Sequence, residues 1–339
     1  MEPVNLKRLA KELNLAISTV SRALRDSYDI SPETKKRVFE LAQQLNYEPN
    51  PYASSLRKQK SRTIAVVIPE VANNFFSLAI NGIESIAQEK GYHVLIYLTH
   101  EDYQKEVSIT RHLQSGRVDG ILMSVSASTE DTSHIVELHN KGIPIIFFDR
   151  VCDAIETSRV TTDDYDSGFK ATEHLIQNGC RQIAYLSFSQ HLSITNKRMR
   201  GYLEALEHYD IKPDRRLMVQ CSIDNGQSYP TLRKMLSGKK RPDGIFASVE
   251  KLAIASYHVC EELKISIPRD IKVISFSNLE TASLLNPSLT TITQPAFDIG
   301  KKAASVLFRS LEKNKQVQLT ETVVLNSALI ARASTRSDK

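Results

Sequence analysis

Short apolar runs alternate with segments of helical periodicity from Thr63 onward, and this alternation occurs in two successive series. Apolar runs without polar alternation are typical of parallel strands that are buried on both faces by helices. The pattern therefore predicts an α/β core of two doubly wound parallel-sheet subdomains, with a ligand-binding cleft between them. The expected buried strands are 64–68, 94–97, 120–123 and 143–148 in the first series, and 183–186, 218–219, 244–246 and 273–276 in the second.

The excess of positive charge lies before this core. Residues 1–62 hold 12 Lys and Arg against 7 Asp and Glu, and this difference equals the net charge of +5 of the whole chain. A local basic excess indicates a polyanionic partner, either nucleic acid or an acidic membrane surface. The charge alone does not distinguish the two.

Two short helices are expected in this basic segment. The first, over residues 6–13, has apolar residues at i, i+3, i+4 and i+7 and ends at Asn14. In the second, Val20 and Ala23 face inward, so hydroxyl and guanidinium groups face outward. This small all-α pattern predicts a helix-turn-helix, whose second helix enters the major groove; a helical hairpin with a solvated polar face is the alternative. The outward residues are Ser18, Ser21, Arg22 and Arg25, while Ile17 lies either in the core or against a thymine methyl group.

A third helix is expected after Ser31, which suits an N-cap, and Pro32, which suits the first helical position. Pro49 prevents the helix from continuing, and Asn50 followed by Pro51 offers another helix start. The helix that would begin at Pro51 is too short to be stable alone, so we expect it to form only against DNA and a partner chain.

The ordered set of these motifs resembles the DNA-binding headpiece and hinge of the lactose-repressor/galactose-repressor (LacI/GalR) family. The resemblance rests on residues 6–24, with Ser18-Thr19-Val20-Ser21-Arg22 at their centre, and on residues 45–53 with Leu56. It implies that residues 17, 18 and 22 contact base edges and that Leu56 enters the minor groove. Ala16 departs from the family, where Ser or Thr commonly caps the second helix. The implied DNA-binding residues are Leu6, Ile17, Ser18, Thr19, Ser21, Arg22, Arg25, Ser31, Thr34, Tyr47, Asn50, Ala53 and Leu56.

The same resemblance covers nearly the whole chain and implies a core similar to periplasmic sugar-binding proteins. It matches motifs such as Asp149-Arg150, Arg198–Tyr202 and Ser288–Pro295. The implied domains are a headpiece (1–49), a hinge and linker (50–62) and an effector-binding and dimerisation core (63–339). Within the core, the first subdomain comprises about 63–160 plus 293–323 and the second about 161–292 plus 324–332.

An effector site in the cleft is implied by position. Asp149 accepts from sugar hydroxyls, Arg198 donates to sugar oxygens, and aromatic side chains cover the apolar sugar face. The alternatives are a loop-capping carboxylate at Asp149 and a surface arginine at Arg198. The implied residues are Asn74, Phe75, Phe76, Asp149, Arg198, Ile223, Glu250 and Ser277.

Three of these residues depart from the family. Glu250 follows Val249 where many members carry an Asn-Asp pair, Ser277 replaces an acidic residue, and Ile223 replaces a frequent aromatic. A hydroxyl at position 277 is a weaker acceptor than a carboxylate, so the effector is not inherited from a typical sugar-responsive member. A sugar or sugar phosphate is the expected effector class.

These features predict a ligand-controlled transcriptional regulator, a homodimer on two-fold-symmetric operator DNA, with repression favoured over activation. The alternative is an α/β enzyme or a sugar-binding protein with a DNA-binding appendage. No enzyme motif such as GxGxxG or GxSxG is found, and no cofactor or metal is expected. The four cysteines form no CxxC pair and are expected to be buried thiols. Neither a membrane-length apolar run nor a secretory signal is present, so a cytoplasmic location is expected.

Overall fold

A computed structural model describes residues 4–47, 61–189, 191–221, 228–238, 240–312 and 320–336. The chain divides into two compact units, Met1–Ser61 and Arg62–Lys339. Four of the implied site residues, Asn50, Ala53, Leu56 and Ile223, lie outside the described residues.

The described part of the first unit contains α1 (Leu6–Leu13), α2 (Ile17–Ala23) and α3 (Pro32–Gln44). The side chain of Asn5 accepts a hydrogen bond from the backbone N–H of Arg8 and so caps α1. Asn14 has a φ of 53°, the left-handed conformation that turns the chain into α2. Ser31 caps α3 by accepting from the N–H of Thr34, and proline follows it. The buried core of this unit comprises Leu9, Ala10, Val20, Ala23, Ile30, Val38 and Ala42.

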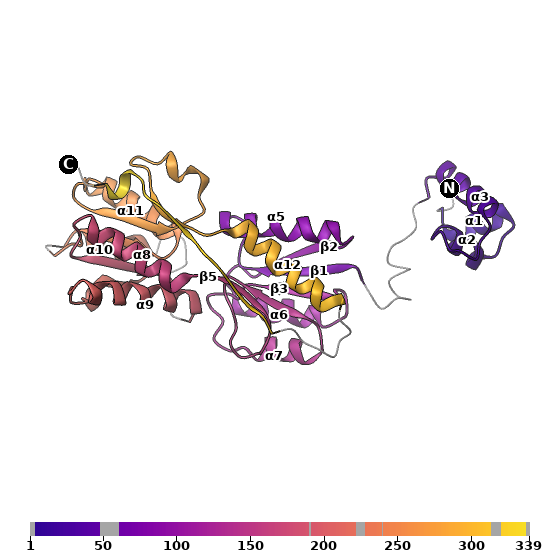
Figure 1. Ribbon diagram of the computed structural model, residues 1–339, viewed down its shortest axis with the longest axis horizontal. Helices are drawn as coiled ribbons and strands as arrows, with labels where there is room; N and C mark the ends of the chain where they lie inside the picture. The colour runs from indigo at the N-terminus through magenta and orange to yellow at the C-terminus, as the bar shows by residue number, and fades with distance from the viewer. Residues whose placement is uncertain are drawn as a thin grey trace. The chain divides into compact units, whose positions relative to one another are not determined.

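The second unit contains two sheets, each of six strands in the part of the chain described (Figure 1). Both sheets have the same strand order. In each, the second strand of the series is an edge strand that pairs with the first, and the later strands follow on the opposite side of the first strand. The first sheet runs β11 (Thr322–Leu325), β5 (Arg159–Thr162), β4 (Ile145–Phe148), β3 (Gly120–Met123), β1 (Thr63–Ile68) and β2 (His93–Leu98). The second runs β12 (Ala328–Ile330), β10 (Thr290–Thr293), β9 (Lys272–Phe276), β8 (Gly244–Ala247), β6 (Ile183–Ser187) and β7 (Met218–Gln220).

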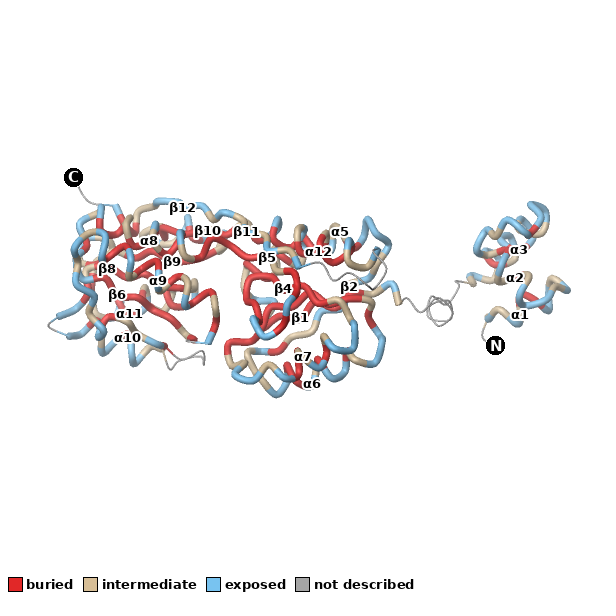
Figure 2. Tube along the Cα trace, turned by 60° about the horizontal axis from the view of Figure 1, so that its bottom comes forward, coloured by how far each residue is buried: buried red, intermediate tan, exposed pale blue. Residues whose placement is uncertain are grey.

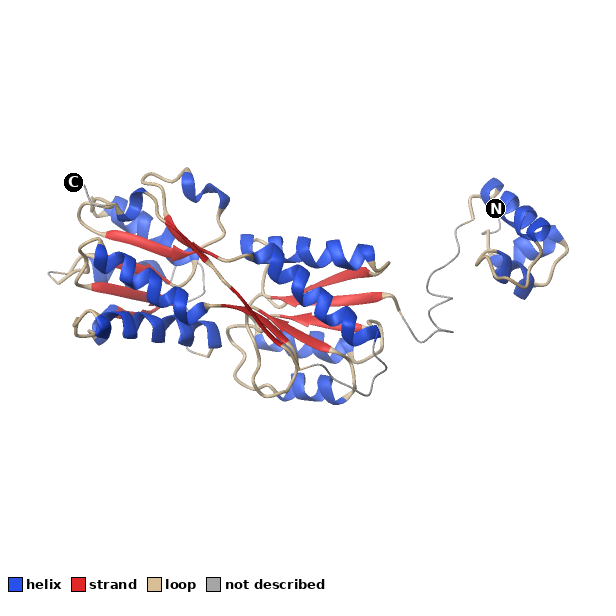
Figure 3. Ribbon diagram, viewed as in Figure 1, coloured by secondary structure: helices blue, strands red, loops and turns tan. Residues whose placement is uncertain are grey.

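Helices cover both faces of each sheet (Figure 3). Alternate residues of β1 show this: Ile64 and Val66 pack with α5 and α12, whereas Ala65 and Val67 pack with α6 and α7. The second sheet is enclosed in the same way, by α8 and α9 on one face and α10 and α11 on the other. The buried strands therefore form the centre of each subdomain (Figure 2). The helices are α5 (Asn74–Glu89), α6 (Tyr103–Leu113), α7 (Ser133–Asn140), α8 (Asp164–Gln177), α9 (Ser193–His208), α10 (Ser228–Leu236), α11 (Glu250–Glu262) and α12 (Ala296–Glu312); short 3₁₀ turns lie at Arg215–Leu217, Glu280–Ser283 and Ala333–Thr335.

The chain passes between the two subdomains three times. It leaves the first sheet after β5, returns after β10 to form α12, and leaves again between β11 and β12, which Figure 1 shows as a yellow segment. β11 pairs with β5 along its whole length, so Val324 and Leu325 belong to the first sheet. The expected boundary had assigned them to the second subdomain. Likewise β5 keeps Thr161 and Thr162 in the first sheet.

Each subdomain contains one pair of helices that pack through glycines. In the first, a Cβ on Gly82 of α5 would overlap the carbonyl oxygen of Phe297, and one on Gly300 of α12 would overlap that of Ala79. In the second, Gly168 of α8 and Gly201 of α9 are in equally close backbone contact with the opposite helix. The absence of side chains at these positions lets the helix backbones touch.

Three expectations about the strands were wrong. β7 is an edge strand, and Met218 and Val219, expected to be buried, are half-buried. β2 is not buried: it is an edge strand, and Leu95 and Ile96 are 42% and 44% exposed. A continuous apolar run cannot distinguish a central strand from an edge strand with an exposed apolar face. The second sheet is also not wholly parallel, because β12 pairs antiparallel with β10 at its edge. The four cysteines are buried free thiols, as expected.

Candidate functional site

The outer face of α2 carries the residues expected to contact bases. Ile17 is 45% exposed, so its side chain lies at the surface and not in the core. Ser18 and Arg22 are exposed beside it, while Val20 and Ala23 are fully buried against α1 and α3. Core packing thus fixes which face of α2 is free.

Both arginines of this face are held by neighbouring groups. Arg22 Nη1 lies 2.6 Å from Asp29 Oδ2, and hydrogen bonds from Ser27 and Arg22 lower the pKa of Asp29. Arg25 donates from Nε to the carbonyl oxygen of Ser21 and from Nη2 to its hydroxyl, both at 2.9 Å. These contacts hold the guanidinium groups against α2 and the loop that follows it.

The remaining headpiece residues lie around this face at different depths. Leu6, Thr19, Thr34 and Tyr47 are half-buried, and Ser31 serves as the cap of α3. Ala16, at the N-cap of α2, makes no side-chain cap. Sequence analysis did not single out Tyr28, which is 99% exposed in the loop after α2. An exposed phenol can donate to a phosphate oxygen, and the signal that was overlooked is an aromatic residue between the polar residues Ser27 and Asp29.

A cleft lies where the carboxyl ends of the strands of the second unit meet, as expected for doubly wound sheets. Its inner pocket of about 40 Å³ is lined by Phe75, Phe76, Asp149, Arg198, Glu250 and Ser277 among others. The structure thus brings together six of the eight implied effector residues. Asn74 is not among the lining residues; its neighbour Asn73 is, and it caps α5 by accepting from the N–H of Phe75.

Arg198 is a buried residue and not a surface arginine. Its Nε donates to Asp164 Oδ1 at 2.7 Å, and its Nη1 donates to the carbonyl oxygen of Ser248 at 2.7 Å. The guanidinium carbon lies 3.6 Å from the centre of the Phe276 ring, a cation–π contact. Three elements of the second subdomain therefore fix the orientation of this side chain.

Asp149 follows β4 in the left-handed conformation, with a φ of 59°. Its carboxylate is buried, with Gln294 Nε2 at 3.5 Å and Arg150 Nε at 3.8 Å. Burial raises the pKa of Asp149 to about 6, although Arg150 and Arg198 act to lower it. The carboxylate is therefore a strong acceptor that has few partners of its own.

Glu250 and Ser277 lie together on the second subdomain's side of the pocket. Ser277 donates from Oγ to Glu250 Oε2 at 2.9 Å, and the same hydroxyl accepts from the N–H of Leu279. Glu250 opens α11, next to the Ser248 carbonyl that Arg198 binds. A carboxylate thus lies within hydrogen-bond distance of Ser277, although position 277 itself carries no acid.

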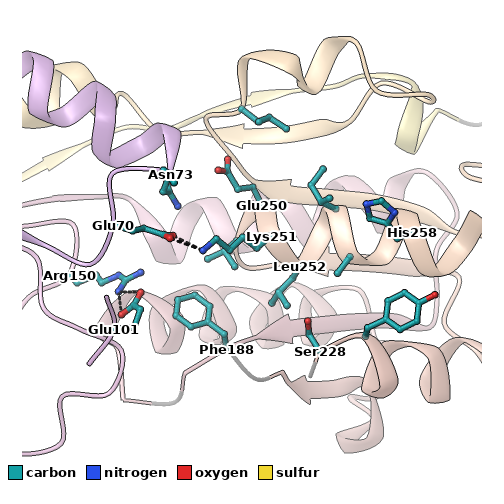
Figure 4. Close-up of a pocket in the computed structure, with 16 residues that line it drawn as sticks. Glu70, Asn73, Glu101, Arg150, Phe188, Ser228, Glu250, Lys251, Leu252 and His258 are labelled. Atoms are coloured by element: carbon teal, nitrogen blue, oxygen red, sulfur yellow. Dashed lines mark hydrogen bonds and ion pairs between the residues drawn. The ribbon is translucent and has the colours of Figure 1, made fainter. Parts of the chain in front are cut away.

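A larger outer cavity of about 630 Å³ adjoins the inner pocket (Figure 4). The two share Asn73, Arg150, Val249 and Glu250. On the first subdomain's side Arg150 donates from Nη1 to both carboxylate oxygens of Glu101, at 2.8 and 2.9 Å. Lys251 Nζ lies 2.7 Å from Glu70 Oε1, so an ion pair joins the two subdomains.

Sequence analysis did not identify Glu70, Glu101, Arg150 and Lys251 as site residues. The first three follow the carboxyl ends of β1, β2 and β4, so strand position was the signal that could have identified them. Within the described ranges, no cluster of three or more His, Cys, Asp or Glu residues is arranged to hold a metal ion. No helix in the described part of the chain has the length and apolar character needed to cross a membrane.

Comparison with known proteins identifies the family. Residues 5–50 match the bacterial regulatory proteins of the lacI family, and residues 172–335 match a periplasmic binding protein-like domain. The HTH-type transcriptional regulator RegA of Clostridium saccharobutylicum is 30% identical over 334 residues, covering 98% of this chain and 99% of RegA. This chain belongs to the lacI family. It is a DNA-binding transcriptional regulator, and the predicted family and fold class are confirmed.

Two solved structures show how fully the LacI fold is shared. The lac repressor dimer bound to operator and the anti-inducer ONPF has a TM-score of 0.85 at 22% identity, covering 99% of this chain and 100% of that one. A LacI family transcriptional regulator from Enterococcus faecium with bound ribose has a TM-score of 0.70 at 27% identity, covering 82% of this chain and 100% of that one. The LacI-family architecture thus extends over both units of the chain.

Proposed function

We propose that this LacI-family regulator is a homodimeric repressor whose affinity for operator DNA is controlled by a small molecule bound in the cleft. The observation that carries the proposal is the position of Asp149 and Arg198. Asp149 follows a strand of the first subdomain, Arg198 lies on a helix of the second, and both line one pocket.

A ligand that contacts both residues ties the subdomains together and biases the angle between them. Such a difference in contacts between two states is what a ligand-controlled switch requires. The expected ligand class is a sugar or a sugar derivative, and the ribose complex of the Enterococcus faecium relative supports this choice. Carboxylate, guanidinium and aromatic groups in one pocket suit a polyhydroxylated ring.

On the DNA side, Ile17, Ser18 and Arg22 are the proposed base-reading residues. They share the face of α2 that core packing leaves exposed. The half-buried and loop residues around them then position the headpiece on the phosphate backbone, which accounts for most hydrogen bonds in protein–DNA complexes.

Homodimer formation is supported by the edge strand β2. Leu95 and Ile96 expose apolar surface beside a row of unpaired backbone groups, an arrangement that natural proteins usually cover. The lac repressor with which the fold is shared is a dimer on its operator. Two copies of α2 would then read two half-sites of a two-fold-symmetric operator.

Operator mapping followed by ligand screening tests the function. Full-length protein should protect a two-fold-symmetric site, and binding should weaken steeply with salt because neutralised phosphates release counterions. A small molecule that binds the core should change operator affinity at least tenfold. A protein consisting of residues 62–339 should remain folded and bind the ligand without retarding DNA. Retardation of DNA by this shorter protein would contradict the assignment of DNA binding to the first unit.

A further inference from the structure

A pocket of about 300 Å³ lies in the second subdomain, at the opposite edge of its sheet from the cleft. Its lining comes from residues 181–183, from residues 202–217 and from Lys240, which lie at or before the start of β6, β7 and β8 or on α9. These three strands are parallel neighbours, so their amino ends lie side by side. The cleft lies at the carboxyl ends of the same strands, and this distal pocket is therefore a separate site.

The rim of the distal pocket is strongly positive. Arg181, Lys212, Arg216 and Lys240 line it and are exposed, and Asp214 is the only acidic side chain among the described residues of the lining. Four cations against one carboxylate leave a local net charge of +3, whereas residues 63–339 as a whole hold equal numbers of basic and acidic residues. Cations gathered from three loops repel one another, and a bound anion would offset this repulsion.

The single carboxylate of the lining is fully used by one of these cations. Arg216 donates from Nε to both oxygens of Asp214, at 3.0 and 3.1 Å, and its backbone N–H donates to the same group at 3.0 Å. These bonds lower the pKa of Asp214 to about 2, so the carboxylate stays ionised and paired with Arg216.

The other three cations of the rim lack such a partner. In the described part of the chain, Arg181, Lys212 and Lys240 form no ion pair with a carboxylate. Asp243, in the loop before β8, accepts instead from the backbone N–H groups of Arg181 and Gln182 at 2.9 to 3.1 Å. Three guanidinium or ammonium groups are thus available to one ligand.

The floor of the distal pocket is apolar. Ile183, Leu206 and Leu217 are buried in it, and Ile211 is half-buried. The hydroxyl of Tyr202 donates to the carbonyl oxygen of Ile183 at 2.8 Å, so this phenol is already satisfied. A cationic rim over an apolar floor favours a ligand with its charge at one end and an apolar or planar body at the other.

A phosphate monoester matches the free cations better than a carboxylate does. It carries a charge of about −1.5 to −2 near pH 7 and has three strong acceptor oxygens, one for each free cation. Arginine and lysine are also the side chains that most often bind phosphate. A volume of about 300 Å³ lies at the lower end of the range for small-molecule sites, which selects a compact ligand.

We propose that the distal pocket binds a compact organic phosphate, a monoester about the size of a mononucleotide. Its phosphate contacts Arg181, Lys212 and Lys240, and its apolar or aromatic body lies against Leu206 and Ile211. This ligand is a second small molecule, bound apart from the one proposed for the cleft. The inference therefore does not rest on the proposed function.

Calorimetry on the full-length protein tests the ligand class with matched probes. AMP, GMP, CMP, UMP and phenyl phosphate are each compared with their dephosphorylated parent and with inorganic phosphate. We expect at least one monoester to bind about tenfold or more tightly than both, because it alone has the charge and the apolar body. A parent compound that binds as tightly as its ester, or no binding by any probe, would overturn the proposal. Tighter binding of hexaglutamate than of every monoester would also overturn it, in favour of an acidic protein segment.

Two charge reversals at the rim locate the phosphate. Lys212→Glu and Lys240→Glu, made singly at exposed positions, should each weaken the monoester about tenfold. Lys234→Glu, on the exposed side of α10 and outside the pocket, is the matched control, with an affinity expected to stay within about twofold. Equal affinities in the three variants would show that the phosphate does not lie at this rim.

Asp149→Asn separates the distal pocket from the cleft. This change removes a negative charge from the inner pocket, so a monoester held in the cleft should bind more tightly to the variant. A monoester in the distal pocket should bind to it as it does to the unmodified protein. An affinity that changes in Asp149→Asn but not in Lys212→Glu would place the probe in the cleft and contradict the inference.

Discussion

Lys251 of the second subdomain forms an ion pair with Glu70 of the first, with 2.7 Å between Nζ and Oε1. Glu70 follows β1 and Lys251 lies in the first turn of α11, so the pair bridges the cleft beside the outer cavity. The lysine side chain is 57% exposed, and solvent therefore screens the attraction. The pair favours the arrangement of the subdomains in this structure without locking it.

Lys251→Ala should therefore change the balance between open and closed cleft more than it changes overall stability. We expect the free energy of unfolding to change by less than about 1 kcal/mol, the usual value of an exposed pair. Ligand affinity, measured by calorimetry, should change about two- to fivefold. Glu70→Gln should have the same effect, and the double variant should add little to either single change, because the two residues share one interaction. Full additivity would show that the pair does not act as a unit.

Asp149 should make stability depend on pH. The pKa of its carboxyl in the folded protein, about 6, lies above the ordinary value of 3.8, so the folded state binds the proton more tightly than the unfolded state. Stability therefore falls as pH rises from about 4 to about 6, and above that range the cost of ionisation is fully present. Two pKa units correspond to about 3 kcal/mol, an upper figure.

Asp149→Asn removes this cost. We expect it to raise the free energy of unfolding in urea at pH 7.5 by up to about 3 kcal/mol, to have little effect at pH 4, and to weaken ligand binding. Asp298→Asn, on the exposed face of α12, is the control and should leave the pH profile unchanged. A profile that is identical in the unmodified protein and in Asp149→Asn would contradict the burial argument.

Asp164→Asn should be strongly destabilising, because Arg198 would keep its charge in a site where both side chains are at most 3% exposed. Removing one partner of a buried pair costs about 3–5 kcal/mol, which chemical denaturation would detect. Asp166→Asn, two residues later on the exposed side of α8, should cost less than about 0.5 kcal/mol. Equal stability of the two variants would mean that the Arg198–Asp164 pair adds nothing to the fold.

Arg22→Ala should reduce discrimination at one operator base pair by about 1–3 kcal/mol, measured by binding to a set of single-base operator variants. Thermal stability should hardly change, since the side chain is exposed. Asp29→Asn should have the opposite effect: it releases Arg22 from its ion pair and removes a negative charge, so operator affinity should rise. Unaltered base preference in Arg22→Ala would show that another residue reads that position.

Gly300→Ala should separate α12 from α5, because the added methyl group would overlap the carbonyl oxygen of Ala79. Overpacking of this kind costs about 1–3 kcal/mol, and backbone atoms cannot move aside as a side chain can. Gly238→Ala serves as the control, since a Cβ there meets its nearest atom at 3.5 Å. A melting temperature for Gly300→Ala equal to that of the control would contradict the close packing of the two helices.

The sequence predicts the paired sheets and the headpiece helices because both depend on local periodicity. It does not show that β2 is an edge strand, since Leu95 and Ile96 are as apolar as the residues of a buried strand. Only the order of strands in the sheet shows that they lie at an edge. The family resemblance implies Asn74 as a pocket residue, whereas its neighbour Asn73, the N-cap of α5, lines the pocket.

The sequence also cannot pair Arg150 with Glu101. These residues lie 49 positions apart and meet only because β2 and β4 end at the same edge of one sheet. The division of the cleft into a small inner pocket and a large outer cavity likewise depends on the angle between the subdomains. No local sequence pattern predicts that angle.

The three passages between the subdomains also determine when each one can fold during synthesis. The first sheet obtains the apolar face of α12, including Ile299, Leu307 and Phe308, only after the whole second sheet up to β10 has been made. The second sheet in turn waits for β12 and for Ser334, whose hydroxyl binds the backbone of β9 and β10. The core of the second subdomain uses residues only up to Ile292, so that half can bury its core before α12 is made, whereas one face of the first sheet stays exposed until then. The two subdomains can therefore complete their cores at different times during synthesis, and truncation before Phe308 would leave the first one unfinished.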